Sequence, residues 1–213
     1  RKMIEIILLI SAVLFIFALK LFGRPSTAHR ANSFAMLAMA LAVFSAFNFD
    51  FSKYDSAFYI TIVVSGLLGV LISKRVQMTQ MPELVGLFNG FGGGASGAIA
   101  YVELSNTSLP ISDVFVAIFS MVIGIFTFSG SLIAVLKLRG KLNNFSTKLG
   151  NIFSVFLPTI LIIPAVLEMD TFLYEFIILV ALIAGVIRVA VIGGADMPVV
   201  IAFLNSLSGI AAM

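Results

Sequence analysis

Residues 193–209 read GGADMPVVIAFLNSLSG, and residues 81–93 read MPELVGLFNGFGG. In both stretches an Asn follows seven residues after the Pro of a Met-Pro pair. Because proline is tolerated in the first turn of an α-helix, each Met-Pro pair predicts a helix start. At about 1.5 Å per residue, Asn89 and Asn205 lie roughly 10 Å inside those helices. The two stretches therefore predict a pair of parallel apolar helices that carry an amide at matched depth.

The composition is that of a membrane protein. Of the 213 residues, 61% are hydrophobic and 11% are charged, whereas soluble domains carry about 25% charged residues. Segments of roughly 17 to 25 apolar residues can cross a bilayer. They predict one all-α transmembrane domain over residues 1–213, a polytopic bundle of about eight helices with the last one truncated. The predicted helices span residues 3–22, 33–49, 56–73, 82–103, 111–136, 149–167, 171–192 and 197–213.

The basic residues predict an orientation. Of the 13 Lys and Arg residues, only Arg1, Lys2 and Lys53 lie outside the odd-numbered loops and the helix ends that those loops join. Cytoplasmic loops carry the excess of Lys and Arg, so the odd loops are predicted to be cytoplasmic and the N-terminus to lie outside. The net charge of +3 is thus assigned to membrane anchoring. The sequence contains neither a basic stripe nor an aromatic platform, which are the features that would predict nucleic-acid binding.

The start of the chain favours a fragment of a longer protein. Residue 1 is Arg and not an initiator Met, and no small-residue cleavage site follows the first apolar segment. We therefore interpret residues 3–22 as a spanning helix and not as a signal peptide.

Three predicted helices carry small and polar residues on one face. Such stripes are commonly packing seams, in which small residues permit close approach and Asn or Ser form hydrogen bonds between helices. Two amides and several hydroxyls at similar depth also suit a short file of water. Both interpretations stay open at this point. The polar set is Asn89, Thr127, Ser131, Asn205 and Ser208, and the predicted packing glycines are Gly93, Gly130 and Gly209.

Ionisable residues are missing from the predicted membrane interior. No Asp, Glu, Lys, Arg or His lies in the central part of a predicted span, and the single histidine, His29, is predicted in the first cytoplasmic loop. Because intramembrane ionisable groups usually mark proton relays and ion sites, no titrating relay is predicted within this chain. Cysteine is absent, and no metal-ligand cluster is found. The residues alone predict a polytopic membrane protein that moves something small.

Three runs resemble the membrane domain of the beta subunit of proton-translocating NAD(P) transhydrogenase. They are QMTQMPELV at residues 77–85, FTFSGSLIA at 126–134, and IGGADMPVV at 192–200, which leads to LNS at 204–206. The resemblance implies that a proton crosses this domain while hydride passes between NAD(H) and NADP(H). It implies that both nucleotides bind soluble domains of the complex and none binds this chain, with the NADP(H) domain following the membrane helices.

The resemblance also implies partners and roles for residues. The implied partners are the alpha subunit and a second beta subunit, in a bilayer predicted to be the bacterial inner membrane. Five positions match functional ones of the family, namely Asn89, Gly130, Ser131, Asp196 and Asn205. The polar set as a whole is assigned to a proton pathway. Asp196 is predicted to cap the last helix and, through the flexible pair Gly193 and Gly194, to couple the pathway to the NADP(H) domain.

Position 89 departs from the family pattern. Many members have a protonatable His there, whereas an amide cannot take up a proton at physiological pH. The resemblance implies that the relay is completed elsewhere, and some members place the His on a partner alpha-type subunit. The alternative hypothesis is a secondary transporter or channel subunit that uses the same polar residues for another small solute.

Overall fold

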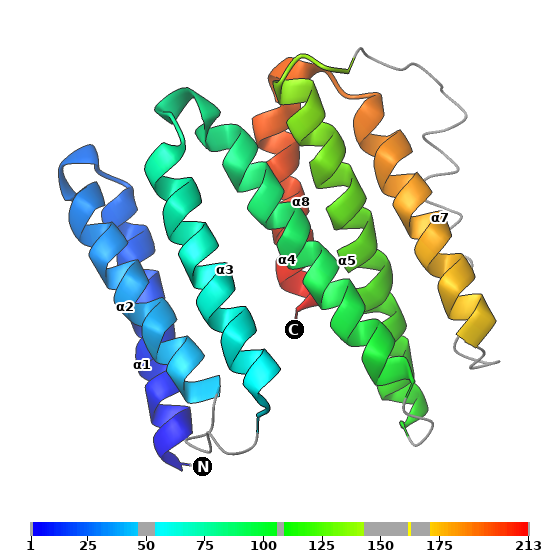
Figure 1. The fold of residues 1–213 in the computed structure, drawn as a ribbon, viewed down its shortest axis with the longest axis horizontal. Coiled ribbons are helices and arrows are strands. Elements are labelled where there is room, and N and C mark those ends of the chain that lie inside the picture. The colour runs from blue at the N-terminus through cyan, green and yellow to red at the C-terminus, as the bar shows by residue number, and fades with distance from the viewer. Residues whose placement is uncertain (1, 47–53, 106–108, 143–161, 163–170, 213) are drawn as a thin grey trace. The chain divides into compact units, whose positions relative to one another are not determined.

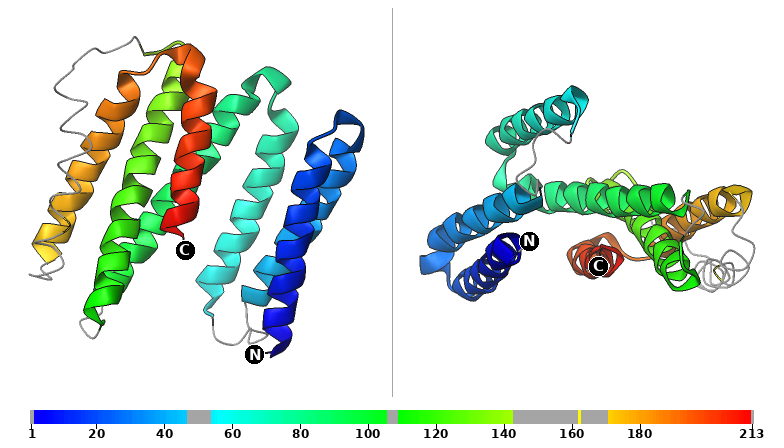
Figure 2. Two further views of the ribbon diagram at one scale, coloured as in Figure 1. Left: turned by 180° about the vertical axis from the view of Figure 1, so that it is seen from behind. Right: turned by 90° about the horizontal axis from the view of Figure 1, so that it is seen from below.

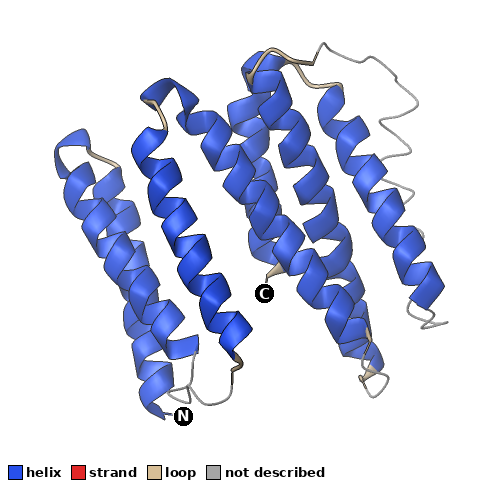
Figure 3. Ribbon diagram, in the orientation of Figure 1, coloured by secondary structure: helices blue, strands red, loops and turns tan. Residues whose placement is uncertain are grey.

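The chain folds into helices throughout the part that the structure describes (Figure 3). The computed structural model describes residues 2–46, 54–105, 109–142, 162 and 171–212. The predicted all-α class is confirmed there, and the predicted span 149–167 lies outside the described residues except for Ile162. The long helices are α1 (Lys2–Phe22), α2 (Ala28–Ala46), α3 (Ser56–Arg75), α4 (Met81–Leu104), α5 (Ile111–Leu138), α7 (Thr171–Ala190) and α8 (Met197–Ala211).

Five of the described helical spans are long and apolar enough to cross a membrane. They are Lys2–Phe22, Ser56–Arg75, Ile111–Leu138, Phe172–Ala190 and Gly194–Ala211. The helices α2 and α4, at 19 and 24 residues, are long enough but are not among these spans. The start of α2 is polar, and α4 contains six glycines.

The predicted start of the second helix is wrong. Helix α2 begins at Ala28 and not at residue 33, so His29 lies in its first turn and not in a loop. A short 3-10 turn, Pro25–Thr27, leads directly into α2, and the Thr27 hydroxyl donates a hydrogen bond to the Leu21 carbonyl at 2.6 Å. Hydropathy placed the boundary too late, because polar residues in the first turn of a helix can remain exposed.

The described chain divides into two compact units, residues 1–74 and 75–213. In the first unit α1 packs against α2. The Ser11 hydroxyl donates to the Ala38 carbonyl at 2.7 Å, and the rings of Phe17 and Phe34 meet edge to face with centroids 5.2 Å apart. A helix hairpin therefore forms with both a polar and an aromatic contact along its seam.

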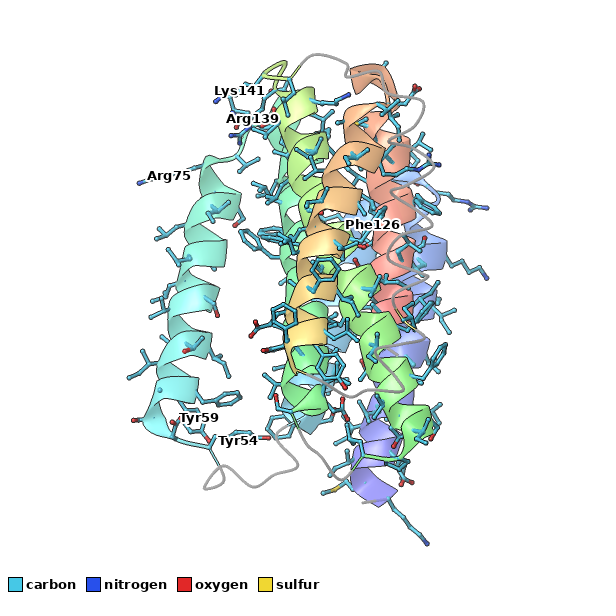
Figure 4. The ribbon with its side chains drawn as sticks, turned by 90° about the vertical axis from the view of Figure 1, so that its right-hand side faces the viewer. Tyr54, Tyr59, Arg75, Phe126, Arg139 and Lys141 are labelled. Atoms are coloured by element: carbon cyan, nitrogen blue, oxygen red, sulfur yellow. The ribbon has the colours of Figure 1, made fainter. Side chains whose placement is uncertain are left out.

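Helix α3 has the end groups that a spanning helix requires. Tyr54 and Tyr59 lie near its first end and Arg75 lies at its last (Figure 4). Aromatic rings prefer the membrane interface, and basic residues mark the cytoplasmic end. One end of α3 is therefore aromatic and the other is basic, and the predicted orientation remains a prediction.

The second unit is built around α5. This helix packs against α4, α7 and α8, and α4 also packs against α8 (Figures 1 and 2). Its buried apolar side chains include Ile118 and Met121 toward one end and Ala134 toward the other. At 28 residues α5 is also the longest described helix, so it forms the axis of this unit.

The two Met-Pro helices begin where predicted and run in the same direction. Helix α4 starts at Met81 and α8 at Met197, each directly after a 3-10 turn. An ion pair of 2.7 Å joins Glu83 in the first turn of α4 to Arg139 after the end of α5. The start of α8 lies at this same end of α5 (Figure 1). The two related stretches are therefore parallel within this unit.

Candidate functional site

Glycines bring the backbones of α4 and α5 into direct contact. A Cβ added to Gly124 would lie 2.5 Å from the Gly93 carbonyl oxygen and 2.7 Å from the Gly97 nitrogen. A Cβ added to Gly93 would lie 3.0 Å from the Thr127 side chain. Close approach of this kind lets short side chains on both helices reach one another.

One amide joins three helices just beyond this contact. Asn89 Nδ2 on α4 donates a hydrogen bond to Ser131 Oγ on α5 at 2.9 Å. Ser208 Oγ on α8 donates a hydrogen bond to Asn89 Oδ1 at 3.2 Å. The same hydroxyl also lies 3.2 Å from the Leu204 carbonyl oxygen. Asn89 is 7% exposed and Ser131 is fully buried. This polar cluster is therefore enclosed by protein on the α4 and α5 sides.

Thr127 lies next to the cluster but does not share its hydrogen bonds. It is fully buried on α5, four residues before Ser131 and on the same face. Among the described residues its Oγ1 is a buried side-chain oxygen without a hydrogen-bond partner. A buried hydroxyl without a hydrogen-bond partner reduces the free energy of unfolding by about 1–3 kcal/mol. Thr127 therefore provides a polar, enclosed position whose hydroxyl lacks a partner among the described residues.

Asn205 does not meet Asn89, contrary to the expectation of paired amides. Its side chain is exposed, and Ser208 is the α8 residue that reaches Asn89. The buried face of α8 is set by apolar residues at spacings of three and four, and Ser208 falls on that face while Asn205 falls beside it. These apolar residues are Met197, Ile201, Leu204 and Ala211.

The two remaining predicted packing glycines differ in their surroundings. A Cβ at Gly130 would lie 3.1 Å from Val189 and 3.4 Å from Leu204, so Gly130 is part of a close contact. A Cβ at Gly209 would find no atom of the described chain within 4 Å. Gly209 lies on the exposed side of α8, so no packing role for it is found among the described residues.

Asp196 lies at the start of α8 without the predicted capping bond. Its side chain is exposed and makes no cap hydrogen bond, and its backbone is helical at φ −89° and ψ −1°. Side-chain caps normally need an extended backbone at this position. Here the 3-10 turn Gly194–Asp196 supplies helical geometry and backbone bonds instead. Gly193 lies close to the carboxylate, since an added Cβ would be 3.7 Å from Oδ2.

Sequence reasoning missed a buried lysine at this end of the bundle. Lys137 was counted among the cytoplasmic anchors, yet it is only 5% exposed. Its Nζ donates hydrogen bonds to the carbonyl oxygens of Ala190 and Ile192. Arg139 and Lys141, further along the same end, are exposed (Figure 4). No local signal separates Lys137 from its neighbours, because its partners lie 53 and 55 residues later.

A cavity lies toward the opposite end of α4 and α5. Its volume is about 380 Å³. Two acidic residues, Glu103 and Asp113, line it together with Ser120, which shares a face of α5 with Thr127 and Ser131. The glycine contact at Gly124 lies between Ser120 and Thr127 along that face. The remaining lining residues are Ser96, Ile99, Ala100, Val116, Ala117, Ala211 and Ala212.

Long apolar helices, with a polar cluster buried between three of them, define a polytopic membrane protein. A family model described as NAD(P) transhydrogenase beta subunit matches residues 4–213, and the chain belongs to this family. The NAD(P) transhydrogenase subunit beta of Rhodospirillum rubrum is 31% identical over 219 residues, covering 96% of this chain and 47% of the relative. A second subunit beta, from a defined strain of that species, gives the same values. The chain thus spans about half the length of these curated relatives.

Proposed function

We propose that this chain is the membrane domain of a proton-translocating NAD(P) transhydrogenase. In this role it couples proton movement across the membrane to hydride transfer between NAD(H) and NADP(H). Family membership supports the general role. The observation that carries the proposal is the Asn89 cluster, in which one amide links α4, α5 and α8 beside the unsatisfied Thr127 hydroxyl. Such groups can hold water in an otherwise apolar bundle.

The proposed proton pathway uses the whole polar set. Asn89, Ser131 and Ser208 form its centre, and Thr127 connects that centre toward the cavity lined by Glu103 and Asp113. Asn205 joins the pathway from the exposed side of α8, where we propose that a helix of another subunit covers it. Because an amide does not titrate, the protonatable group of the relay is proposed to come from the partner alpha subunit.

The nucleotides are proposed to bind outside this chain. NAD(H) and NADP(H) are assigned to soluble domains of the full complex, which contains the alpha subunit and a second beta subunit. The N-terminus is proposed to lie on the outer side of the bacterial inner membrane, so that α4 and α8 start at the cytoplasmic side. The exposed Asp196, with Gly193 and Gly194 before it, then faces the NADP(H) domain.

The test of this function uses the full complex in sealed vesicles. Hydride transfer from NADPH to an NAD⁺ analogue is followed by absorbance, and proton movement is followed with a pH-sensitive dye. Proton movement should accompany hydride transfer and disappear when a protonophore is added. Hydride transfer without proton movement in tight vesicles would contradict the proposal. Movement of another solute under these conditions would favour the transporter alternative.

The coupling role of Asp196 predicts a specific loss in Asp196→Asn. Removing the charge should weaken NADP(H) affinity severalfold and abolish its response to a proton gradient. Since the side chain makes no capping bond, stability should change by less than about 0.5 kcal/mol, as at ordinary surface positions. Isothermal titration of NADPH measures the affinity, NADPH binding to sealed vesicles with and without an imposed proton gradient measures the response, and thermal unfolding measures the stability.

The matched control for Asp196 is Glu5→Gln, which removes an exposed acid in the first turn of α1. It should leave NADP(H) affinity unchanged. Unchanged affinity in Asp196→Asn, together with a lower unfolding temperature, would mean that Asp196 serves only the start of α8.

A further inference from the structure

Lys137 is unusual because a charged side chain is buried at the end of a helix. Only 5% of the residue is exposed, whereas lysine is rarely buried unless its ammonium group is paired. It belongs to the last turn of α5, and its Nζ donates to the carbonyl oxygens of Ala190 and Ile192. These carbonyls lie at the last residue of α7 and just beyond it. A cation there satisfies free acceptors and the negative end of the α7 dipole.

The backbone near Lys137 also approaches the other side of the same connection. A Cβ added to Gly194 would lie 3.7 Å from the Lys137 carbonyl oxygen. Gly194 begins the 3-10 turn that ends at Asp196 and leads into α8. Lys137 therefore binds the first part of the α7–α8 connection through its ammonium group, and its carbonyl lies near Gly194 further along that connection. We call residues 190–196 the connecting segment.

The connecting segment is thereby tied to the helix that carries the polar cluster. Ser131, which accepts the hydrogen bond from Asn89, lies on α5 six residues before Lys137. Arg139, two residues after Lys137, pairs with Glu83 of α4 at 2.7 Å. One end of α5 thus holds two different partners: Arg139 holds the start of α4, and Lys137 holds the connecting segment.

We propose that Lys137 is a positioning residue that fixes the connecting segment to α5, so that a displacement of α5 at Ser131 moves Asp196. The mechanical tie is inferred from the contacts alone. Its use in coupling rests on the function proposed above. Lys137 acts through Asp196 and is not itself part of the proton pathway.

Hydrogen–deuterium exchange of the full complex in nanodiscs tests the tie. The amides of Ile192 and Asp196 donate to Val189 and Gly193 at 3.2 and 3.1 Å, so their exchange reports opening of the connecting segment. Lys137→Met keeps the side-chain stem but removes the donor. Exchange at these amides should accelerate by roughly tenfold to a hundredfold, as expected when a charge-assisted hydrogen bond is lost. Lys137→Arg, which retains donors and charge, should restore most of the protection.

Two matched variants separate the tie from general effects of charge. Lys141→Met removes an exposed lysine beyond the same helix end and should leave the exchange unchanged. Arg139→Gln should accelerate exchange at the start of α4 and not in the connecting segment. If Lys137→Met fails to assemble, Lys137→Gln supplies the measurement, because its neutral amide makes weaker hydrogen bonds than the ammonium group and should still accelerate exchange. Wild-type exchange in the folded Met or Gln variant would overturn the proposed tie.

The functional arm measures protons moved per hydride transferred. Lys137→Met should keep hydride transfer between bound nucleotides while this ratio falls severalfold, and Lys137→Arg should recover it. Faster exchange with an unchanged ratio would overturn the coupling role while leaving the tie established. If wild type moves no protons, the proposed transhydrogenase function fails, and the exchange experiment still decides whether Lys137 fixes the connecting segment.

Discussion

Replacing Asn89 with Leu is expected to reduce proton movement by about a hundredfold or more while leaving the complex assembled. The amide is the only group that contacts both Ser131 and Ser208 in the described cluster. Leucine has similar size but offers neither a donor nor an acceptor, so both hydroxyls lose their shared partner and water loses its anchor. Dye-based proton uptake in vesicles, normalised to hydride transfer, measures the effect.

Asn205→Leu is the matched variant, since it makes the same chemical change on an exposed face of α8. If only this chain lined the pathway, Asn205→Leu would have the smaller effect. A comparable loss in both variants would support a pathway shared between this chain and a covering subunit. Normal pumping in Asn89→Leu would show that the cluster serves packing alone, and the proposed route would be wrong.

Gly124→Ala is expected to destabilise the second unit by forcing α4 and α5 apart. The new Cβ would lie 2.5 Å from the Gly93 carbonyl oxygen and 2.7 Å from the Gly97 nitrogen. Both neighbours are backbone atoms that cannot rotate away, so α4 and α5 must separate. Overpacking of this kind costs roughly 1–3 kcal/mol. The midpoint of thermal unfolding in detergent should therefore fall by several degrees.

Gly92→Ala is the control for Gly124→Ala. Gly92 lies on α4 beside the contact glycine, but a Cβ there would find no atom of the described chain within 4 Å. Alanine also has the higher helix propensity, so this variant should match or slightly exceed wild-type stability. Equal unfolding midpoints in the two variants would mean that the close α4–α5 contact does not hold in the assembled protein.

Several features of the fold could be predicted because their causes are local. Proline restricts the helix position that it can occupy, so Met81-Pro82 and Met197-Pro198 each mark a helix start. Apolar length indicates membrane spans without knowledge of any contact. The same reasoning failed at α2, because hydropathy cannot show whether a polar stretch such as residues 28–32 belongs to a helix turn or a loop.

The candidate site could be predicted only in part. The polar residues of α8 predict one buried face, whereas the apolar spacing of Met197, Ile201 and Leu204 determines which face is buried. That spacing turns Ser208 inward and Asn205 outward. The role of Lys137 could not be predicted, because the carbonyls that it binds become neighbours only when α5 and α7 pack together.

The unsatisfied hydroxyl of Thr127 affects when water enters the seam between α4, α5 and α8. A dry seam leaves that oxygen without a partner in the described bundle, which raises the free energy of the dry state by about 1–3 kcal/mol. The first water molecule to reach Thr127 recovers much of this energy, so hydration there is favourable once a passage opens. The backbones of Gly93 and Gly124 meet directly beside Thr127, so we expect water to enter there only when α4 and α5 separate. On this expectation, hydration of Thr127 depends on how closely α4 and α5 approach one another.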